Sequence, residues 1–495
     1  MTSHLEGAPF LVPAPETPEP VITALPFAAV VAPVLGAVVV RLAPEGSIRW
    51  LGAVAAGATA ASAGALTMAV ARQGTVESVA GAVTVGSDGH SAILLGMTAL
   101  VGLVISAQVT AGDFGSGTGE PAPRTFWSQW LLLWAALNTY YVAGDLLTIY
   151  AAFLLLLGAA TGLIQGGGTQ EAREAARRYL LTGFAGSVLY LAGTLVVLGH
   201  AGTVAFNGLD DAAPAFAVML ATAGLLLKVG LFPLHSWLPA AHGHAPAPVS
   251  PILSGVVGKA SFYVVLRLWF DVTAEAPTYA AAQVVGVLAG VGVLWASVAA
   301  LGQNRLKLLI AYSTVAQIGY FFLLVPLAAG SHEWRWAAWD GGIYLALAHG
   351  LAKAALFAAA GTYVSVSRSD RLEDVAQAAG RLPVTSFAVG VAAVSLVGLP
   401  PSGGFVGKWY LTLASVGSGQ GWWLLPVLGG GLLTGLYLLR VVRLPFTATA
   451  TEADASVPRT VEFCTLTLAL GALLIGLRAV EPLNLLGDVP GFVDP

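Results

Sequence analysis

Apolar runs of about 20 residues recur along nearly the whole chain, and this repetition constrains the fold more than any other feature of the sequence. A helix of that length crosses the roughly 30 Å of hydrocarbon in a bilayer. Lipid offers the backbone no hydrogen bonds, so each spanning segment must be a helix or part of a closed barrel. These runs are too long and too uniformly apolar to be barrel strands. The sequence therefore predicts an all-α polytopic membrane protein.

The runs predict about fourteen spans, two of them broken. They lie near residues 21–42, 48–71, 91–111, 126–143, 145–165, 178–199, 213–232, 249–270, 278–302, 306–328, 340–365, 384–418, 421–442 and 459–480. Two connections have predicted structure of their own: a short hairpin at 80–90, and a surface helix at 166–178, which is too polar to span. Residues 1–20 lack a basic cluster and indicate a disordered tail rather than a signal peptide.

Composition excludes several classes of function. Only 10% of the residues are charged and 57% are hydrophobic, whereas a soluble domain carries roughly 25% charged residues. The net charge is −4 and there is no basic tail, so we do not expect nucleic acid as a partner. The single cysteine, Cys464, excludes a disulfide framework, an iron–sulfur cluster and a CxxC redox pair.

Basic residues are distributed unequally between the two sets of connections. One set holds fourteen: Arg41, Arg49, Arg124, Arg173, Arg177, Arg178, Arg305, Lys307, Arg368, Arg371, Arg381, Arg440, Arg443 and Arg459. The other set holds four: Arg72, Arg267, Arg335 and Arg478. Cytoplasmic connections of membrane proteins carry the excess of Lys and Arg. The distribution therefore predicts an even number of spans, with both termini outside the cytoplasm.

Four of the five lysines, Lys228, Lys259, Lys353 and Lys408, fall inside predicted spans. Arginine stays protonated nearly everywhere, whereas burial can bring the pKa of a lysine toward neutrality. A buried charge costs at least about 2.5–3.5 kcal/mol, so such residues are usually functional. The alternative is that they snorkel to the interface. Lys259 stands about ten residues into its span, roughly 15 Å deep, which disfavours snorkelling.

Histidines accompany these lysines at two places. His349 and Lys353 are four residues apart in one span, share a helix face and predict a proton relay. His235, His242 and His244 cluster in FPLHSWLPAAHGHAPAP. The HxH spacing is compatible with a metal site, but no carboxylate or cysteine accompanies it, so we expect no metal. We interpret the segment as a polar loop that leads to the lysines.

Two predicted spans are interrupted close to a lysine. Pro233 follows Lys228 in span seven, and SLVGLPPSGGFVGKWY interrupts span twelve just before Lys408. Broken spans at corresponding places in two halves of a chain are typical of inverted-repeat transporters with sites near the midplane. Unwound backbone at that depth is tolerated only where protein or water covers it.

The segments around these residues resemble one protein family. KVGLFPLHSWLPAAHGHAPAPVSPILSGVVGKASFYVVLR, YSTVAQIGY, HGLAKAALF and GLPPSGGFVGKW are similar to motifs of the proton-conducting antiporter-like subunits. That family comprises large membrane subunits of respiratory complex I, of membrane-bound hydrogenases and of Mrp-type cation/proton antiporters. The resemblance covers roughly residues 90–445. Span number and length most resemble those of the D-type Mrp antiporter protein and the N-type complex I protein.

The resemblance implies two inverted five-helix repeats with broken helices seven and twelve. It divides the chain into 21–111 (spans 1–3), 126–270 (spans 4–8), 278–442 (spans 9–13) and 459–480 (span 14). It also implies roles for the buried residues. Lys228 matches the lysine of the first half-channel, Lys259 the connecting lysine and Lys408 the lysine of the second half-channel. His349 and Lys353 match the polar pair that bridges the central axis.

One position departs from the family pattern. The family has a glutamate in span five that pairs with the lysine of span seven, but Leu154 stands there in DLLTIYAAFLLLL. Asp145, at the edge of the same span, is retained. Lys228 therefore lacks its usual counter-ion, and we expect an altered or inactive first half-channel.

The leading hypothesis is a proton-conducting subunit of a multisubunit cation/proton antiporter or respiratory complex in a bacterial or archaeal plasma membrane. Its partners would be other membrane subunits and lipid, and its ions would be protons, with Na⁺ as a candidate counter-ion. The second hypothesis is a degenerate structural subunit of such a complex, or of an inorganic-carbon uptake complex. An independent small-solute carrier fits the motifs less well. We expect no cofactor and no redox site, because the chain has no nucleotide loop, cluster cysteines or haem histidine pair.

Overall fold

The computed structural model describes residues 20–81, 83–112, 122–209, 213–270, 272, 279–330, 333–447 and 457–486. Most of these residues are helical, and eleven helical segments among them are long and apolar enough to cross a membrane. A bent pair of helices raises that number to twelve. The prediction of an all-α polytopic membrane protein is therefore confirmed, whereas the number fourteen is not. The predicted tail, 1–20, lies almost entirely outside the described residues.

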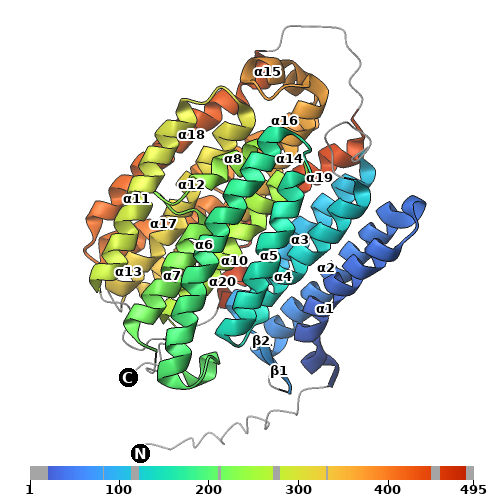
Figure 1. Cartoon of the computed structure of the whole chain (residues 1–495). Helices are drawn as coiled ribbons and strands as arrows, with labels where there is room; N and C mark the ends of the chain where they lie inside the picture. The colour runs from blue at the N-terminus through green and yellow to red at the C-terminus, as the bar shows by residue number, and fades with distance from the viewer. Residues whose placement is uncertain are drawn as a thin grey trace, which may run out of the picture.

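The N-terminal part forms an outer layer at one side of the bundle (Figure 1). It consists of α1 (Pro20–Leu42), η1 (Glu45–Ser47), α2 (Ile48–Gln73), β1 (Val76–Ala80), β2 (Val83–Ser87) and α3 (Gly89–Ala111). The two strands pair antiparallel, so the predicted hairpin forms, starting a few residues earlier than expected. We call the end of the bundle that carries it the hairpin side.

The next helices surround the first broken span. They are α4 (Pro123–Val142), α5 (Leu146–Gln165), α6 (Gln170–Ala201), η2 (Phe206–Gly208), α7 (Ala215–Val229), α8 (Trp237–His244), α9 (Val249–Ile252), η3 (Leu253–Val257) and α10 (Gly258–Phe270). The separate surface helix predicted at 166–178 was wrong. Its residues from Gln170 onward are the first turns of α6, because the helix continues without a break from the polar segment into the apolar one.

The remaining helices surround the second broken span. They are α11 (Tyr279–Leu301), α12 (Leu306–Phe322), α13 (Leu324–Gly330), α14 (Arg335–Ser367), α15 (Leu372–Arg381), α16 (Pro383–Val397), α17 (Gly403–Gly417), η4 (Gly421–Trp423), η5 (Leu425–Gly429), α18 (Gly430–Val442), η6 (Leu444–Phe446), α19 (Arg459–Leu477) and α20 (Val480–Leu486).

Both predicted breaks are present, and they are built alike. The helices α7 and α16 each end at a glycine in the left-handed region, Gly230 with φ 78° and Gly398 with φ 86°. Glycine adopts this conformation without the penalty that a Cβ atom imposes, so it is the usual residue at such an end. A proline stands three residues after each glycine, Pro233 and Pro401.

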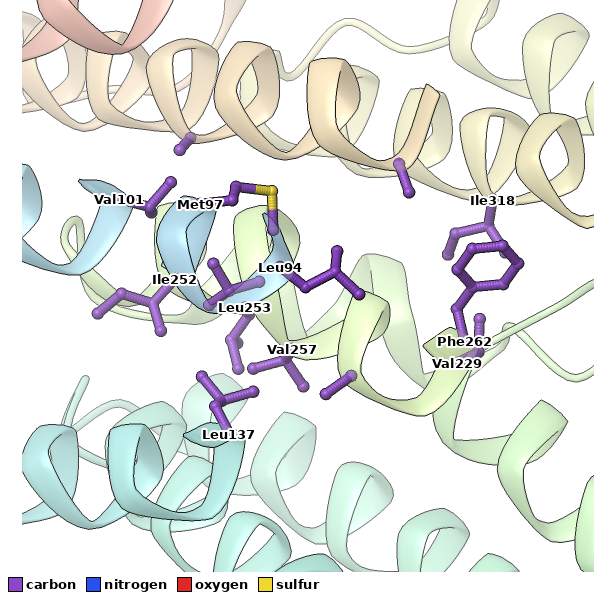
Figure 2. Close-up of a cluster of buried hydrophobic side chains, with 14 of the residues drawn as sticks. Leu94, Met97, Val101, Leu137, Val229, Ile252, Leu253, Val257, Phe262 and Ile318 are labelled. Atoms are coloured by element: carbon purple, nitrogen blue, oxygen red, sulfur yellow. The ribbon is translucent and has the colours of Figure 1, made fainter. Parts of the chain in front are cut away.

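Burial increases toward the middle of the bundle. The most apolar window of α14 is 100% buried and that of α9–α10 is 94% buried, against 28% for α1. Around η3, side chains of α3, α4 and α9 pack into one apolar cluster (Figure 2). The backbones of η3 and α14 approach closely there, since a Cβ on Gly350 would lie 2.8 Å from the carbonyl oxygen of Gly255.

The ends of the described chain share one side of the bundle. The helix α1 packs on β1, and α20 packs on α3 next to the hairpin. The helix α15 lies at the opposite end (Figure 1). This placement agrees with the predicted even number of spans, and which side faces the cytoplasm stays a prediction.

Candidate ion-translocation site

The four lysines of the predicted spans all lie inside the bundle. Lys228, Lys259, Lys353 and Lys408 are each at most 8% exposed. Each Nζ atom contacts neutral groups, namely carbonyl oxygens, hydroxyls or aromatic rings. Among the described residues, the salt bridges given by the structure involve only arginines and none of these lysines. A lysine without a fixed carboxylate partner can bind and release a proton without breaking a strong ion pair.

A π-helical turn places Lys259. The turn η3 directly precedes α10, and Lys259 is the second residue of α10. Its Nζ donates to the carbonyl oxygen of Ser254 at 2.5 Å, five residues earlier in the chain. The Ser254 hydroxyl in turn lies 3.0 Å from the Thr314 hydroxyl of α12. π-helical turns within α-helices frequently occur at functional sites.

Lys353 and His349 project from adjacent turns of α14. Lys353 Nζ donates to the carbonyl oxygen of Ile310 at 3.0 Å and to the hydroxyl of Ser313, both on α12. Both ring nitrogens of His349 lack a hydrogen-bond partner among the described residues. Buried polar atoms in this condition are rare and call for an explanation.

A small cavity supplies that explanation. This central cavity, of about 20 Å³, is lined by Lys259, His349, His242 and the hydroxyl-bearing Ser254 and Thr314. A cavity needs roughly 10–15 Å³ of such volume, with two or more polar partners, to hold a water molecule. The cavity meets both conditions, so it can hold a water molecule beside Lys259 and His349.

The predicted histidines divide into two groups. His242 of α8 lines the central cavity and stacks on Phe357 of α14, with the ring centroids 4.8 Å apart. His235 lies in the break after α7 and packs against the rings of Phe232 and Trp295. The structure thus brings His242 to Lys259 and His349 at the central cavity, whereas His235 does not line this cavity.

Lys408 lies at the second break. Its Nζ donates to the carbonyl oxygens of Leu396 at 3.0 Å and Val397 at 2.8 Å, the last two residues of α16. It also lies 4.4 Å from the ring centroid of Tyr320. The free carbonyls at a helix C-terminus carry partial negative charge and favour a cation. The break therefore creates the binding site for the ammonium group.

Lys228, at the first break, has aromatic neighbours instead. Its Nζ donates to the hydroxyl of Tyr179 on α6 and lies 4.1 Å from the centroid of the same ring. The ring of Phe153 on α5 lies 5.6 Å from Nζ. Such cation–π contacts contribute about 0.5–2 kcal/mol each.

Two positions on α5, 154 and 145, were considered as the source of a carboxylate for Lys228, and neither supplies one. Leu154, where the resemblance places a glutamate, is 40% exposed, and its neighbour Phe153 contacts Lys228 instead. Asp145 caps the N-terminus of α5, where its carboxylate accepts from the backbone N–H of Thr148 at 2.7 Å and from the Thr148 hydroxyl. Asp145 therefore has a structural role at the end of the helix.

Sequence reasoning missed the neutral partners of the lysines. Ser313 and Tyr320 lie in YSTVAQIGY, a motif noted only for its resemblance, whereas Tyr179 had no signal because it comes from a distant helix. Lys307 was assigned to a surface connection, but it is 8% exposed. Its Nζ donates to the carbonyl oxygen of Ala245 at 2.9 Å, directly after α8.

Comparisons with known proteins agree with this geometry. Residues 143–434 match the family described as "NADH:quinone oxidoreductase/Mrp antiporter, TM". The chain is 34% identical over 358 residues to the NADH-quinone oxidoreductase subunit N of Desulforudis audaxviator, covering 70% of each protein. It is 31% identical over 385 residues to an NAD(P)H-quinone oxidoreductase chain 4 of Microcystis aeruginosa, covering 75% of this chain and 67% of the relative.

Solved structures share the fold. A chain of the Mrp complex from Dietzia sp. superposes with a TM-score of 0.82 at 22% identity, covering 94% of this chain and 97% of that one. A chain of the membrane-bound sulfane sulfur reductase, an archaeal respiratory membrane complex, gives a TM-score of 0.84 at 22% identity, with 94% and 96% covered. A chain of respiratory complex I from Thermus thermophilus gives 0.74 at 23% identity, with 93% and 98% covered. Since the family match spans more than half of the sequence, the chain belongs to the NADH:quinone oxidoreductase/Mrp antiporter transmembrane family and is an antiporter-like membrane subunit.

Proposed function

We propose that this chain conducts protons within a multisubunit membrane complex. The path runs from Lys353, His349 and Lys259 around the central cavity to Lys408 at the second break. The single observation that carries the proposal is the central cavity: it has room for a water molecule between Lys259 and a histidine whose ring nitrogens are both unbonded within the described structure. A proton relay needs groups that exchange hydrogen-bond partners at membrane depth.

The setting follows from the relatives. They are named as subunits of quinone oxidoreductases, and the structural neighbours come from multisubunit membrane complexes. We therefore place the chain in a prokaryotic plasma membrane beside other membrane subunits. Its ions would be protons, with Na⁺ as the candidate counter-ion. Any redox chemistry would belong to other subunits of the assembly.

The first half-channel favours a second candidate, a subunit that contributes structure but does not translocate ions. Lys228 is surrounded by the rings of Phe153 and Tyr179, and among the described residues no carboxylate forms an ion pair with it. We infer that conduction does not depend on this half. Protons instead pass through the part of the bundle formed by α11–α18 and through the central cavity.

The test is to replace Lys408 in the assembled complex and to measure ion-coupled transport in membrane vesicles. Lys408→Ala should abolish transport. Lys408→Arg should also be inactive, because arginine keeps the charge but does not release a proton. Arg177→Ala, which removes an exposed cation, is the matched control and should be neutral. Normal transport in both Lys408 variants would support the structural candidate.

A further inference from the structure

A second cavity lies nearer the hairpin side and is not used by the path described above. This outer cavity, of about 10 Å³, is enclosed by α3, α10 and α14. Its polar lining consists of Asp88 and His90 at the start of α3, Tyr263 and Arg267 of α10, and Trp339 of α14. It is therefore a small polar space with four ionisable groups at the hairpin end of the bundle.

The outer cavity and the central cavity lie one after the other along the same faces of α10 and α14. Tyr263 and Arg267 follow Lys259 at intervals of four residues, so the three share one face of α10. Arg267 is eight residues from Lys259, or about 12 Å along the helix. On α14, Ala346 lines the outer cavity, and His349, three residues later, lines the central one. The same faces of two helices thus border both cavities.

Aromatic rings separate the two cavities. Phe262 lines the outer cavity and Phe321 lines the central one, and their ring centroids are 4.8 Å apart. In Figure 2 the ring of Phe262 is directed toward Ile318 of α12, which also lines the central cavity. A rotation of one side chain, Phe262, would therefore remove a large part of the wall.

A hydrogen bond holds His90 in one protonation form. The indole Nε1–H of Trp339 donates to Nε2 of His90 at 2.7 Å. An indole nitrogen only donates, so Nε2 must be the acceptor and the ring proton is on Nδ1. His90 cannot take up a second proton at Nε2 until this bond to Trp339 breaks. The other charged groups that interact with His90 are Asp88 and Arg267.

We propose that the outer cavity is an outlet through which protons leave Lys259 and His349 toward the hairpin side. Phe262 closes it, and breaking the hydrogen bond from Trp339 frees Nε2 of His90 to accept a proton. A proton is then passed from the ammonium group of Lys259 through water to His90 and from there to the aqueous phase. This outlet rests on the proposed proton conduction and gives the protons an exit at the hairpin side of the bundle, between α3, α10 and α14.

Accessibility of a cysteine tests the gate. The only cysteine is Cys464, so Cys464→Ala gives a cysteine-free background in this chain for two test thiols, Ala346→Cys in the outer cavity and Ile318→Cys in the central cavity behind Phe262. Ag⁺ added to vesicles of either orientation should modify the outer-cavity thiol from the hairpin side only. Phe262→Ala should raise at least tenfold the rate at which Ag⁺ from that side modifies the thiol of Ile318→Cys. Ala348→Cys, on the same helix as Ala346 but packed against Gly403 of α17, should stay unmodified. Modification from the opposite side, or no acceleration by Phe262→Ala, would overturn the outlet.

Transport measurements separate this proposal from the one on which it rests. His90→Gln keeps an acceptor for Trp339 but cannot be protonated, so it should lower ion-coupled transport at least tenfold with normal assembly. If His90→Gln is fully active while Lys259→Ala is inactive, the outlet is elsewhere and proton conduction stands. If Lys259→Ala is also fully active, proton conduction through this chain fails. If His90→Gln does not assemble, the cysteine experiment decides.

Discussion

The ammonium group of Lys228 lies over the ring of Tyr179, with Nζ 4.1 Å from the ring centroid, and donates a hydrogen bond to the hydroxyl of the same residue. One tyrosine thus supplies two contacts to Lys228, in place of the carboxylate that the resemblance implies for position 154. A neutral partner does not attract the positive charge of protonated Lys228 as a carboxylate would. A carboxylate beside it would favour the protonated form.

Removing the hydroxyl of this tyrosine should weaken the fold around α6 and α7. Tyr179→Phe keeps the ring and loses the hydrogen bond, which is worth about 1.5–3 kcal/mol when one partner is charged. We expect a lower midpoint of thermal unfolding for the solubilised complex and little change in transport. Tyr179→Ala, which also removes the ring, should lower the midpoint further. A larger loss of transport than of stability would show that Lys228 takes part in conduction.

Introducing an acid beside Lys228 should have different effects at two neighbouring positions. Phe153 contacts Lys228, whereas Leu154 is 40% exposed. An opposite charge within about 4–6 Å favours the protonated form of a lysine. Phe153→Glu should therefore change the pH dependence of transport more than Leu154→Glu, measured in the same vesicles. The reverse order would mean that α5 presents Leu154 to Lys228 in the assembled complex.

Replacing His349 by leucine should separate stability from activity. In the described structure neither ring nitrogen bonds to another residue, so the substitution breaks no direct hydrogen bond within the protein. His349→Leu should therefore abolish transport without lowering thermal stability, because no proton can pass through the central cavity. Unchanged transport in this variant would exclude His349 from the path.

The buried carboxylate of α19 should be needed for stability alone. Glu462 is 8% exposed and accepts from the backbone N–H of Thr385 at 3.1 Å and from its hydroxyl at 3.0 Å. Thr385 lies in the first turn of α16, and a negative charge there interacts favourably with the helix dipole. Glu462→Gln should lower the unfolding midpoint and leave transport rates per assembled complex unchanged. A transport defect with normal stability would assign Glu462 a role in conduction.

The sequence predicted those features that follow from local chemistry. Pro233 and the segment from Pro400 to Gly404 mark the broken helices, and apolar flanks place Lys259 deep in its span. The sequence did not predict the hydrogen-bond partners of the buried lysines, because these depend on how distant helices pack. The position of Leu154 could be assigned by resemblance, but the direction of its side chain depends on how α5 is rotated against α7. The polar start of α6 looked separate because composition changes along the helix, while the backbone is continuous.

The π-helical turn η3 fixes the rotational phase of everything that follows it on α10. Such a turn closes with hydrogen bonds one residue longer than those of an α-helix. Deleting a single residue between Leu253 and Val257 would restore ordinary winding and turn Lys259 by about 100° relative to α9. Such a deletion removes no ionisable side chain. It would nevertheless turn Lys259 of α10 away from His349 of α14.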